Sequence, residues 1–379
     1  MDRGIHVLGL GNLGKYVAFA LRQGHQTDVP SRLPPVTLFF HKRYLLRHWE
    51  SENRSISYIP EIDTLPPESR KLGRATGFRV ELVGDAAAGI QPSEIENHPG
   101  VVVGSDAPIR HLIVATKTMA TTSAIAPIKH RLNKDSHILF LQNGMGVADE
   151  VSEKLFPDPE SRPTYWAGIC SSGIYYKSPF TFVHAGTGAL SVGVVGGASP
   201  ASADLPPPAN MDRNPMVTQL LDAPLLGARL LSPERTLRAQ LLKLVVNSII
   251  NPLTAIFGCK NGHLIESAEA RDMSLHLLQE AGLIVRALLP RSSGELVEQE
   301  FTDAALGDFV WDVARKTANN TSSMLQDVRN GKPTEIDYIN GYLVSQGQRL
   351  GLPTTHHAKI CRMIKQLESE HASQRSQET

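Results

Sequence analysis

The chain has no excess of charge of either sign. Among its 379 residues, lysine and arginine together number 38, and aspartate and glutamate also number 38, so the formal net charge is zero. Proteins that bind nucleic acid or an anionic membrane surface normally carry a clear positive excess. We therefore expect no nucleic acid and no membrane as partners, and small molecules instead.

Cysteine is scarce. The three cysteines, Cys170, Cys259 and Cys361, are odd in number and far apart, which fits neither a disulfide framework nor a zinc site. We expect no metal and a reducing compartment. Because the first strand-like segment begins at Ile5, no room is left for a cleavable signal or transit peptide, and a cytoplasmic protein is predicted.

Long uninterrupted apolar runs are missing as well. A membrane-spanning helix needs about eighteen apolar residues or more, and even the run 241–257 contains Lys243, Asn247 and Asn251. A helix turns about 100° per residue, so these three side chains share one stripe. Buried ammonium and carboxamide groups need polar partners. The stripe therefore indicates a ligand site, although bonds to neighbouring helices would also satisfy it.

The length of the chain predicts two domains, because 379 residues exceed the usual size of one hydrophobic core. In the first half, apolar runs alternate with helical stretches, which is typical of a parallel sheet. The runs lie at 5–10, 36–40, 111–115 and 137–141. Gly-punctuated runs within 167–195 predict antiparallel strands that finish the sheet or cover its edge. We assign residues 1–230 to this domain, with an insertion at about 47–108 and a Pro-rich linker at about 196–225.

Residues 231–379 are expected to be helical. Ser232 is a suitable N-cap and Pro233 a suitable first helical residue. Gly351 and Pro353 are typical of a stop between the last two helices. The predicted helices lie at about 233–256, 264–289, 296–329, 334–350 and 355–372.

A glycine-rich loop follows the first predicted strand and precedes a helical stretch. It consists of Gly9, Leu10, Gly11, Asn12, Leu13 and Gly14. In a dinucleotide-binding turn of this pattern, the first glycine permits the turn, the second lets the backbone approach a pyrophosphate, and the third allows close packing of helix on strand. The anion binds at the helix N-terminus. We expect the loop to bind a dinucleotide, although a Gly-rich turn without a ligand has the same pattern.

The end of the second strand favours one form of the cofactor. Sites that prefer NAD place an acidic residue there to bind the ribose hydroxyls, whereas this chain has His41, Lys42 and Arg43. Cations suit a ribose 2′-phosphate, so NADP(H) is predicted. A solvated basic turn is the alternative.

Further polar residues follow two more strands. Lys117 follows the third strand and Asn143 the fourth, at the strand ends where open α/β sheets bind ligands. Lys117 is placed to reach the cofactor, and Asn143 to bridge nicotinamide ribose and substrate. Either is also a common turn residue.

Hydroxyl and carboxylate side chains interrupt the helices of the second half at Ser322, Ser323 and Glu335. Each also has a purely structural explanation. Glu335 suits the first turn of a helix that Thr334 would cap, and Ser322 and Ser323 are small residues that pack well.

Taken together, these segments closely resemble the ketopantoate reductases, or 2-dehydropantoate 2-reductases. The resemblance is carried by the glycine loop at 9–14, LQNGMG at 141–146, KLVVNSIINPLTA at 243–255, NG at 261–262, SSMLQDV at 322–328 and TEIDYINGYL at 334–343. It implies an N-terminal Rossmann-type α/β domain and an all-α C-terminal domain like that of 6-phosphogluconate dehydrogenase. The insertion and the linker look longer than in a compact member of the family.

The resemblance also implies roles for single residues. Lys243 matches the catalytic lysine, a general acid that protonates the carbonyl oxygen. Glu335 matches a glutamate close to the cofactor and reaction centre, and Lys117 and Asn143 match cofactor contacts. The positions that match substrate-binding residues are Asn247, Asn251, Asn261 and Ser323.

The implied reaction is NADPH-dependent reduction of 2-dehydropantoate to (R)-pantoate in pantothenate biosynthesis. The chemistry agrees, because ketone reduction builds negative charge on oxygen and a lysine stabilises it. The alternatives are reduction of another small 2-keto acid, a dehydrogenase of phosphorylated or amino-acid substrates, and a noncatalytic NADPH-binding regulator. A homodimer is among the assemblies that the sequence leaves open.

Overall fold

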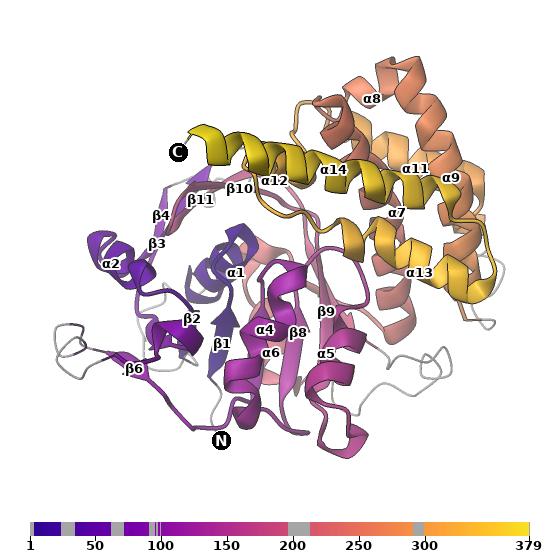
Figure 1. Cartoon of the computed structure of the whole chain (residues 1–379). Helices are drawn as coiled ribbons and strands as arrows, with labels where there is room; N and C mark the ends of the chain where they lie inside the picture. Colours follow the sequence, from indigo (N-terminus) through magenta and orange to yellow (C-terminus); the bar gives the residue numbers. More distant parts are fainter. Residues whose placement is uncertain are drawn as a thin grey trace. The chain divides into compact units, whose positions relative to one another are not determined.

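The structure is a computed structural model that describes residues 4–23, 35–61, 72–90, 95, 98, 100–195, 213–290 and 299–378. The chain folds into two compact units. The first lies within residues 1–142, 148–197 and 205–236, and the second contains residues 143–147 and 237–379. The first is built on a parallel sheet and the second is helical (Figure 1), so the predicted fold class is confirmed.

Among the described residues of the first unit, nine strands form one sheet. In spatial order they are β13 (Arg229–Leu230), β12 (Leu190–Val194), β9 (Thr164–Cys170), β8 (His137–Phe140), β7 (His111–Val114), β1 (Ile5–Leu8), β2 (Val36–Phe40), β5 (Arg79–Leu82) and β6 (Val101–Val103). Every neighbouring pair is parallel except β12 with β9. The four predicted strands are confirmed. Their apolar side chains are buried, as expected for a parallel sheet that is covered on both faces.

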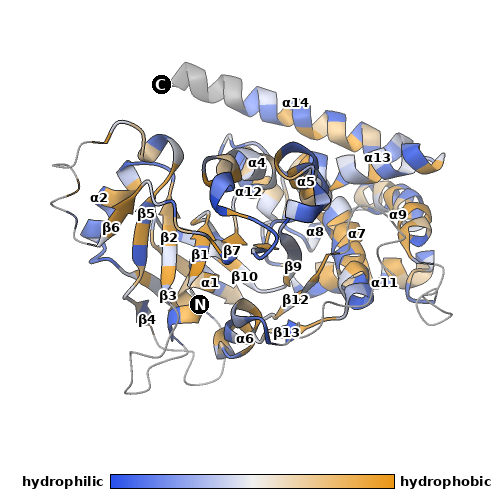
Figure 2. Ribbon diagram, turned by 90° about the horizontal axis from the view of Figure 1, so that it is seen from below, coloured by the Kyte–Doolittle hydropathy of each residue, from blue (hydrophilic) through white to orange (hydrophobic). Residues whose placement is uncertain are grey.

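Strand β1 occupies the point in this sheet where the strand order reverses. The chain passes from β1 to β2 on one side and later returns to β7 on the other. Open α/β sheets bind ligands at the carboxyl ends of the strands beside such a point. Helix α1 (Asn12–Gln23) leaves β1 there and buries Tyr16, Phe19 and Leu21 in the core of this unit. Figure 2 shows the mainly apolar colouring of β1 and β2.

A second, four-stranded sheet packs on α1. Its order is β10 (Gly173–Ser178), β11 (Thr181–Gly186), β3 (Ile56–Pro60) and β4 (Gly73–Ala75). The prediction that strands within 167–195 finish the sheet is confirmed for β9 and β12, whereas the β10–β11 hairpin belongs to the second sheet, which packs on α1. The described part of residues 47–108 contributes β3 and β4 to the second sheet and β5 and β6 to the first.

Lys15 fastens the second sheet to α1. Its side chain is 1 % exposed, and Nζ donates to the carbonyls of Ser178 and Thr181 at 3.0 and 3.1 Å. Nζ also lies 4.7 Å from the centre of the Tyr176 ring. Burial lowers the pKa of Lys15 to about 8. Lys15 therefore holds the turn of the β10–β11 hairpin and is part of the scaffold behind the glycine loop.

The other α-helices in the described part of the first unit are short. They are α2 (Tyr44–Ser51), α4 (Thr121–Ile125), α5 (Val147–Leu155) and α6 (Pro215–Leu221). The predicted linker at 196–225 lies partly outside the described residues. Its described end is not a loop, because Asn214 caps α6 by accepting hydrogen bonds from the amides of Met216 and Val217 and Pro215 occupies the first turn.

The second unit has helices that pack around one hydrophobic core. They are α7 (Pro233–Phe257), α8 (His263–Glu266), α9 (Ala268–Leu288), α11 (Asp303–Lys316), α12 (Ser323–Arg329), α13 (Asn340–Leu350) and α14 (Thr355–Glu378). The start of α7 at Pro233 is confirmed, and the Ser232 hydroxyl accepts from the amide of Arg235. Gly351 ends α13 in the left-handed conformation with φ of 67°, as predicted.

Three predicted helices differ from the observed ones. The helix predicted at 264–289 is divided into α8 and α9, because the Ser267 hydroxyl accepts from the amide of Ala270 and caps α9. The helix predicted at 296–329 is interrupted after Lys316, and α12 starts anew at Ser323 because the Ser322 hydroxyl caps it through the amide of Leu325. The helix predicted at 334–350 begins only at Asn340. It follows a 3₁₀ turn, η11 (Ile336–Tyr338), that leaves Glu335 outside regular helix.

Helix α7 is a core helix. By length and composition it could cross a membrane, but 61 % of its most apolar window is buried within the folded chain. The buried residues include Leu244, Val245 and Ile249. Such burial is what a central helix of a folded domain requires, because neighbouring helices cover its apolar faces.

Candidate active site

The carboxyl edge of the main sheet gathers four polar loops of the first unit. The glycine loop follows β1, residues 41–43 follow β2, residues 115–117 follow β7, and Gln142 lies just after β8. Because these four strands are parallel neighbours, their carboxyl ends meet at one edge. The structure thereby assembles side chains that are far apart in sequence.

Two glycines of the loop are required by the protein's own packing. Gly9 has φ of 96°, and a Cβ there would lie 2.5 Å from the amide nitrogen of Thr116. A Cβ on Gly14 would lie 1.9 Å from the carbonyl oxygen of Gly9. A side chain at either position would push β1, α1 and the loop after β7 apart, so these glycines explain the tight turn.

Gly11 is different, because the protein does not need a glycine there. Gly11 is exposed. A Cβ added there would have only the carbonyl oxygen of Ala115 nearby, at 3.7 Å, which is an ordinary van der Waals distance. The open space in front of Gly11 is what a pyrophosphate needs for close approach to the backbone. The amide of Lys15 already bonds to the carbonyl of Gly11, whereas the amides of the first turn of α1, at Asn12 and Leu13, precede any helical acceptor. The loop therefore fits a dinucleotide.

The basic residues after β2 have different environments. Lys42 and His41 are exposed at the surface. Neighbouring atoms still partly desolvate the His41 ring, and this desolvation together with the charge of Lys42 lowers the pKa of His41. Arg43 donates to the carbonyls of Ala86 and Ala88, so its guanidinium holds the loop after β5. Lys42 is the better placed of the two cations to meet a ligand.

The loops after β7 and β8 interact within the first unit. Lys117 is exposed and precedes the 3₁₀ turn η4 (Thr118–Ala120). The Gln142 amide donates to the hydroxyl of Thr121 at 2.8 Å, which ties the ends of β7 and β8 together. Lys117 thus lies on an ordered loop at the carboxyl edge.

In the second unit, the three polar residues of the stripe all lie on α7. Lys243, Asn247 and Asn251 follow each other at one helical turn each. Lys243 and Asn247 are half-buried, and Asn251 is 9 % exposed. Their apolar neighbours on α7 pack into the helical core. We call this partly buried set the recessed stripe, and the residues of α7 between its members are mainly apolar.

Asn143 and Glu335 meet in the second unit. Asn143 Nδ2 donates to Glu335 Oε2 at 3.0 Å, and Glu335 is buried. Next to this bond, the amide of Met145 donates to the carbonyl of Tyr338 at 2.9 Å. The segment 143–147 therefore packs with the helical unit, although it follows a strand of the sheet.

Asn261 and Ser323 lie near the break between α11 and α12. Asn261 is buried and its amide nitrogen donates to the hydroxyl of Thr317 at 2.9 Å. Ser323 is exposed at the first position of α12. The neighbouring Ser322 hydroxyl accepts from Thr254 of α7 at 2.7 Å, which couples the start of α12 to the helix that carries the stripe.

Comparison with known proteins identifies the family of this chain. The model of the ketopantoate reductase PanE/ApbA family matches residues 5–197, and that of its C-terminal part matches residues 235–368. The chain belongs to the ketopantoate reductase family.

Members of this family include reductases with different substrates. A probable 2-dehydropantoate 2-reductase of Schizosaccharomyces pombe is 29 % identical over 357 residues, covering 94 % of this chain and 93 % of that protein. A ketoisovalerate reductase, BEA2, of Gibberella fujikuroi is 24 % identical over 402 residues, covering 97 % and 84 %. The solved structure of D-mandelate dehydrogenase with NADH and anilino(oxo)acetate has a TM-score of 0.70 at 17 % identity, covering 97 % and 99 %. The family is thus one of NAD(P)-dependent 2-keto acid reductases, and some members are dimeric.

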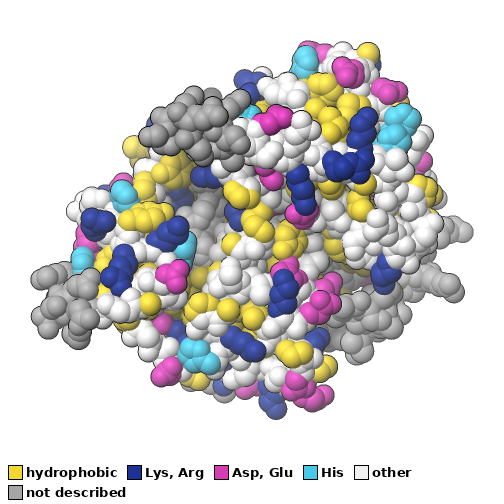
Figure 3. All heavy atoms as spheres, in the orientation of Figure 1, with side chains coloured by type: hydrophobic (Ala, Val, Ile, Leu, Met, Phe, Trp, Pro, Cys, Tyr) yellow, Lys and Arg dark blue, Asp and Glu magenta, His cyan; other side chains and the backbone are white. Residues whose placement is uncertain are grey.

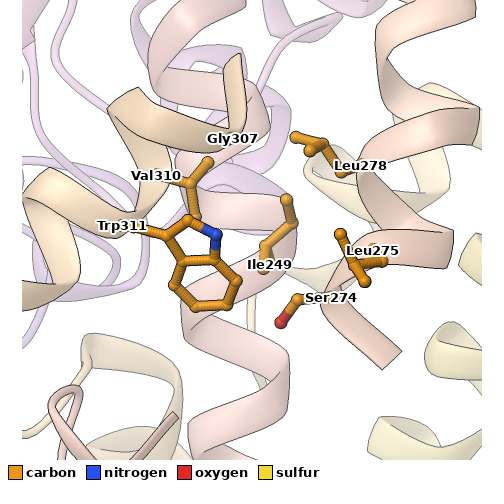
Figure 4. A pocket seen from close by; sticks show the side chains of 7 residues that line it. All are labelled: Ile249, Ser274, Leu275, Leu278, Gly307, Val310 and Trp311. Carbon is orange, nitrogen blue, oxygen red and sulfur yellow. The ribbon is translucent and has the colours of Figure 1, made fainter. Parts of the chain in front are cut away.

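A pocket in the helical unit does not contain the polar stripe of α7. Figure 4 shows its lining, in which Ile249 of α7 faces Trp311 and Leu278. Ile249 is two positions from both Asn247 and Asn251, which places it about 200° around the helix from each. The pocket is therefore on the other side of α7 from the stripe.

Sequence reasoning missed polar residues that support the site. Asn340 is completely buried, yet it had no assigned role although it belongs to the TEIDYINGYL segment of the ketopantoate reductases. Thr254 and Ser322 also escaped notice as a bonded pair. The local signal was a polar residue among apolar neighbours, because Thr254 and Ser322 are 68 positions apart and Asn340 is 92 positions from Ser248.

Proposed function

We propose that the protein reduces 2-dehydropantoate to (R)-pantoate with NADPH, as a step of pantothenate biosynthesis in the cytoplasm. The observation that carries the proposal is the recessed stripe of Lys243, Asn247 and Asn251 on α7. A small keto acid with a hydroxyl offers a carboxylate, a carbonyl and a hydroxyl, which are groups that an ammonium and two carboxamides bind. The similarity to 2-dehydropantoate 2-reductases over 94 % of the chain supports the choice.

Lys243 is the proposed general acid. Reduction of a ketone builds negative charge on the carbonyl oxygen, and an ammonium group stabilises that charge before it donates its proton. The apolar neighbours of Lys243 on α7 exclude water and strengthen this interaction. Lys243 therefore serves both as the electrostatic stabiliser of the oxygen and as the proton donor.

The amide and hydroxyl groups orient the substrate in this proposal. Asn247 and Asn251 offer donors and acceptors one helical turn apart, which suits a carboxylate and a hydroxyl on one small molecule. Asn261 and Ser323 are proposed as further substrate contacts. Fixing the keto acid in this way lowers the entropic cost of reaching the transition state.

The glycine loop and the loops beside it are proposed to hold NADPH. A bound nicotinamide supplies the hydride. The loop 9–14 and the first turn of α1 are proposed to bind the pyrophosphate, and Lys42 the 2′-phosphate. Lys117 is proposed as a further cofactor contact. The Asn143–Glu335 pair is proposed to bind the nicotinamide ribose, since both groups form hydrogen bonds with hydroxyls.

The test is NADPH oxidation in the presence of 2-dehydropantoate, followed at 340 nm. We expect turnover with 2-dehydropantoate and a lower KM for NADPH than for NADH. Lys42→Ala should raise the KM for NADPH about tenfold or more and leave that for NADH unchanged. Equal constants for both cofactors would remove the NADPH preference, and the exposed Lys134 provides a control variant, Lys134→Ala.

A second candidate is reduction of a different 2-keto acid. The similarity to the ketoisovalerate reductase of Gibberella fujikuroi, over 97 % of this chain, favours including it. A panel of 2-dehydropantoate, 2-ketoisovalerate and pyruvate separates the candidates, because only the first carries the hydroxyl that the second asparagine would bind. Cofactor binding without turnover of any of them would favour a noncatalytic regulator.

We also propose a homodimer as the state in solution, as in the dimeric Staphylococcus aureus enzyme. The described surface carries charges of both signs close together, as Figure 3 shows for one face, so that no strong single-sign field opposes self-association. Sedimentation or light scattering would distinguish a dimer from a monomer.

A further inference from the structure

Helix α7 contains a proline next to the last residue of the stripe. Pro252 directly follows Asn251, and the helix continues to Phe257. Proline has no amide hydrogen, so residue 252 cannot donate to the carbonyl of Ser248 as another residue would. This carbonyl lies one position after Asn247 and is buried, where an unpaired oxygen is costly.

The missing donor is replaced by a side chain from another helix. Asn340 Nδ2 donates to the carbonyl oxygen of Ser248 at 2.9 Å, across 92 positions of the chain. Asn340 is the first residue of α13 and is completely buried. A hydrogen bond within α7 would only close one helical turn, whereas this one ties α7 to a different part of the unit.

A second contact fixes the direction of the Asn340 amide. Asn340 Nδ2 lies 3.0 Å from His357 Nδ1, and His357 Nε2 lies 3.0 Å from the carbonyl oxygen of Leu277. A carbonyl only accepts, so the ring hydrogen is on Nε2 and Nδ1 accepts from Asn340. The amide nitrogen therefore faces both acceptors, and Asn340 cannot turn its oxygen towards Ser248 without losing both bonds.

Asn340 also stands at the end of the loop that carries Glu335. The 3₁₀ turn at 336–338 and Ile339 are all that separate the two residues. The Ser248–Asn340 bond thus sets the position of the Glu335 loop relative to the turn of α7 that presents Asn247 and Asn251. Both groups of side chains belong to the proposed reaction site.

We propose that Asn340 is a positioning residue for keto acid reduction, which supplies the donor that Pro252 removes and so holds the asparagines of α7 in register with the Glu335 loop. This inference rests on the proposed function. Pro252 also has a role in this proposal, because the proline leaves the Ser248 carbonyl available to a donor from outside the helix.

A double-mutant cycle with Asn340→Leu and Pro252→Ala tests the proposal. Leucine is close to asparagine in volume but cannot donate, while alanine at 252 restores an amide donor to Ser248. The loss of the bond to His357 is common to both Asn340→Leu variants, so it cancels in the cycle. Each variant is measured for steady-state kinetics and for urea unfolding.

In the natural background, Asn340→Leu should raise the KM for the keto acid about tenfold or more and leave the KM for the cofactor unchanged. In the Pro252→Ala background, Asn340→Leu should raise the KM for the keto acid about threefold or less. Ser274→Ala is the control, since its hydroxyl bonds to the Ala270 carbonyl within α9 at 2.7 Å and its loss should leave both constants unchanged.

Equal effects of Asn340→Leu in the two backgrounds would overturn the inference, as would coupling that appears in unfolding but not in the KM for the keto acid. Were Asn340→Leu unable to fold, Asn340→Ala, which removes the donor without adding bulk, takes its place in the same cycle. A natural protein that reduces no 2-keto acid would overturn the proposed function and this inference with it. An active natural protein with additive variants would overturn only the inference.

Discussion

Glu335 accepts a 3.0 Å hydrogen bond from Asn143, a residue 192 positions earlier in the chain. Asn143 follows a strand of the sheet, but its segment packs with the helical unit. A buried carboxylate with an amide donor is held in one orientation. The pair therefore gives the helical unit a fixed polar group contributed by two segments that are far apart in the sequence.

Two substitutions of Glu335 distinguish the effect of its charge from the effect of its hydrogen bond to Asn143. Glu335→Gln keeps an oxygen that accepts from Asn143, whereas Glu335→Ala removes the acceptor and leaves the Asn143 donor without this partner. We expect the alanine variant to raise the KM for the cofactor more, by about tenfold relative to glutamine, in steady-state kinetics. Equal constants for the two variants would show that the bond to Asn143 has no part in binding.

Lys243→Ala should abolish turnover while the protein remains folded. Without the ammonium group, the negative charge on the carbonyl oxygen is neither stabilised nor protonated, and kcat should fall by about 10³-fold or more. Circular dichroism checks the fold, and Lys359→Ala, at an exposed position on α14, is the control. Near-normal turnover of Lys243→Ala would rule out its role as the general acid.

Gly11→Ala and Gly14→Ala form a matched pair that separates cofactor binding from folding. A Cβ at Gly14 collides with the carbonyl oxygen of Gly9, whereas a Cβ at Gly11 has ordinary space. We expect Gly14→Ala to be destabilised by about 2 kcal/mol or more. Gly11→Ala should unfold like the natural protein, yet bind NADPH at least about tenfold more weakly. Thermal melting and fluorescence titration measure the two effects, and unchanged affinity in Gly11→Ala would contradict the assigned pyrophosphate site.

His357 should make the protein less stable in acid. Burial lowers its pKa to about 4, against an ordinary value of about 6.5 in the unfolded chain. Between these values the unfolded state binds the proton and the folded state does not, so stability falls as the pH decreases from about 6.5 to about 4. The loss amounts to about 3 kcal/mol. The carboxylate of Glu280, which accepts from the amides of His356 and His357, partly opposes the shift.

The measurement is urea unfolding at several pH values for the natural protein and for His357→Gln, whose side chain does not titrate. The difference between the two stabilities isolates the histidine from the carboxylates that are also protonated in acid. A difference that does not change between pH 6.5 and pH 4 would contradict the prediction.

Features set by local chemistry were predictable from the sequence. Ser232 and Pro233 start α7, and Gly351 ends α13, because caps act on the residues beside them. The glycine loop was recognisable because the turn, the strand before it and the helix after it are consecutive. The alignment of Lys243, Asn247 and Asn251 followed from helical geometry alone, once 233–256 was taken as a helix.

The interruption before α12 was harder to predict. Residues 296–329 have a continuous helical pattern, but Ser322 caps a new helix and bonds to Thr254 at 2.7 Å. The hydroxyl alone was compatible with a small packing residue. Its partner on α7 decides between the two roles, and a sequence pattern contains no information on a contact across 68 positions.

The sequence by itself determined four central strands of the main sheet, the start of α7, the dinucleotide loop and the polar stripe of α7, because each depends on neighbouring residues and on the periodicity of one element. Only the tertiary structure decided that residues 143–147 join the helical unit, and that Asn340 donates to the carbonyl which Pro252 leaves without a helical partner. These outcomes depend on which buried donor reaches which buried acceptor. That is a property of packing between distant segments, where every buried polar group must find a partner.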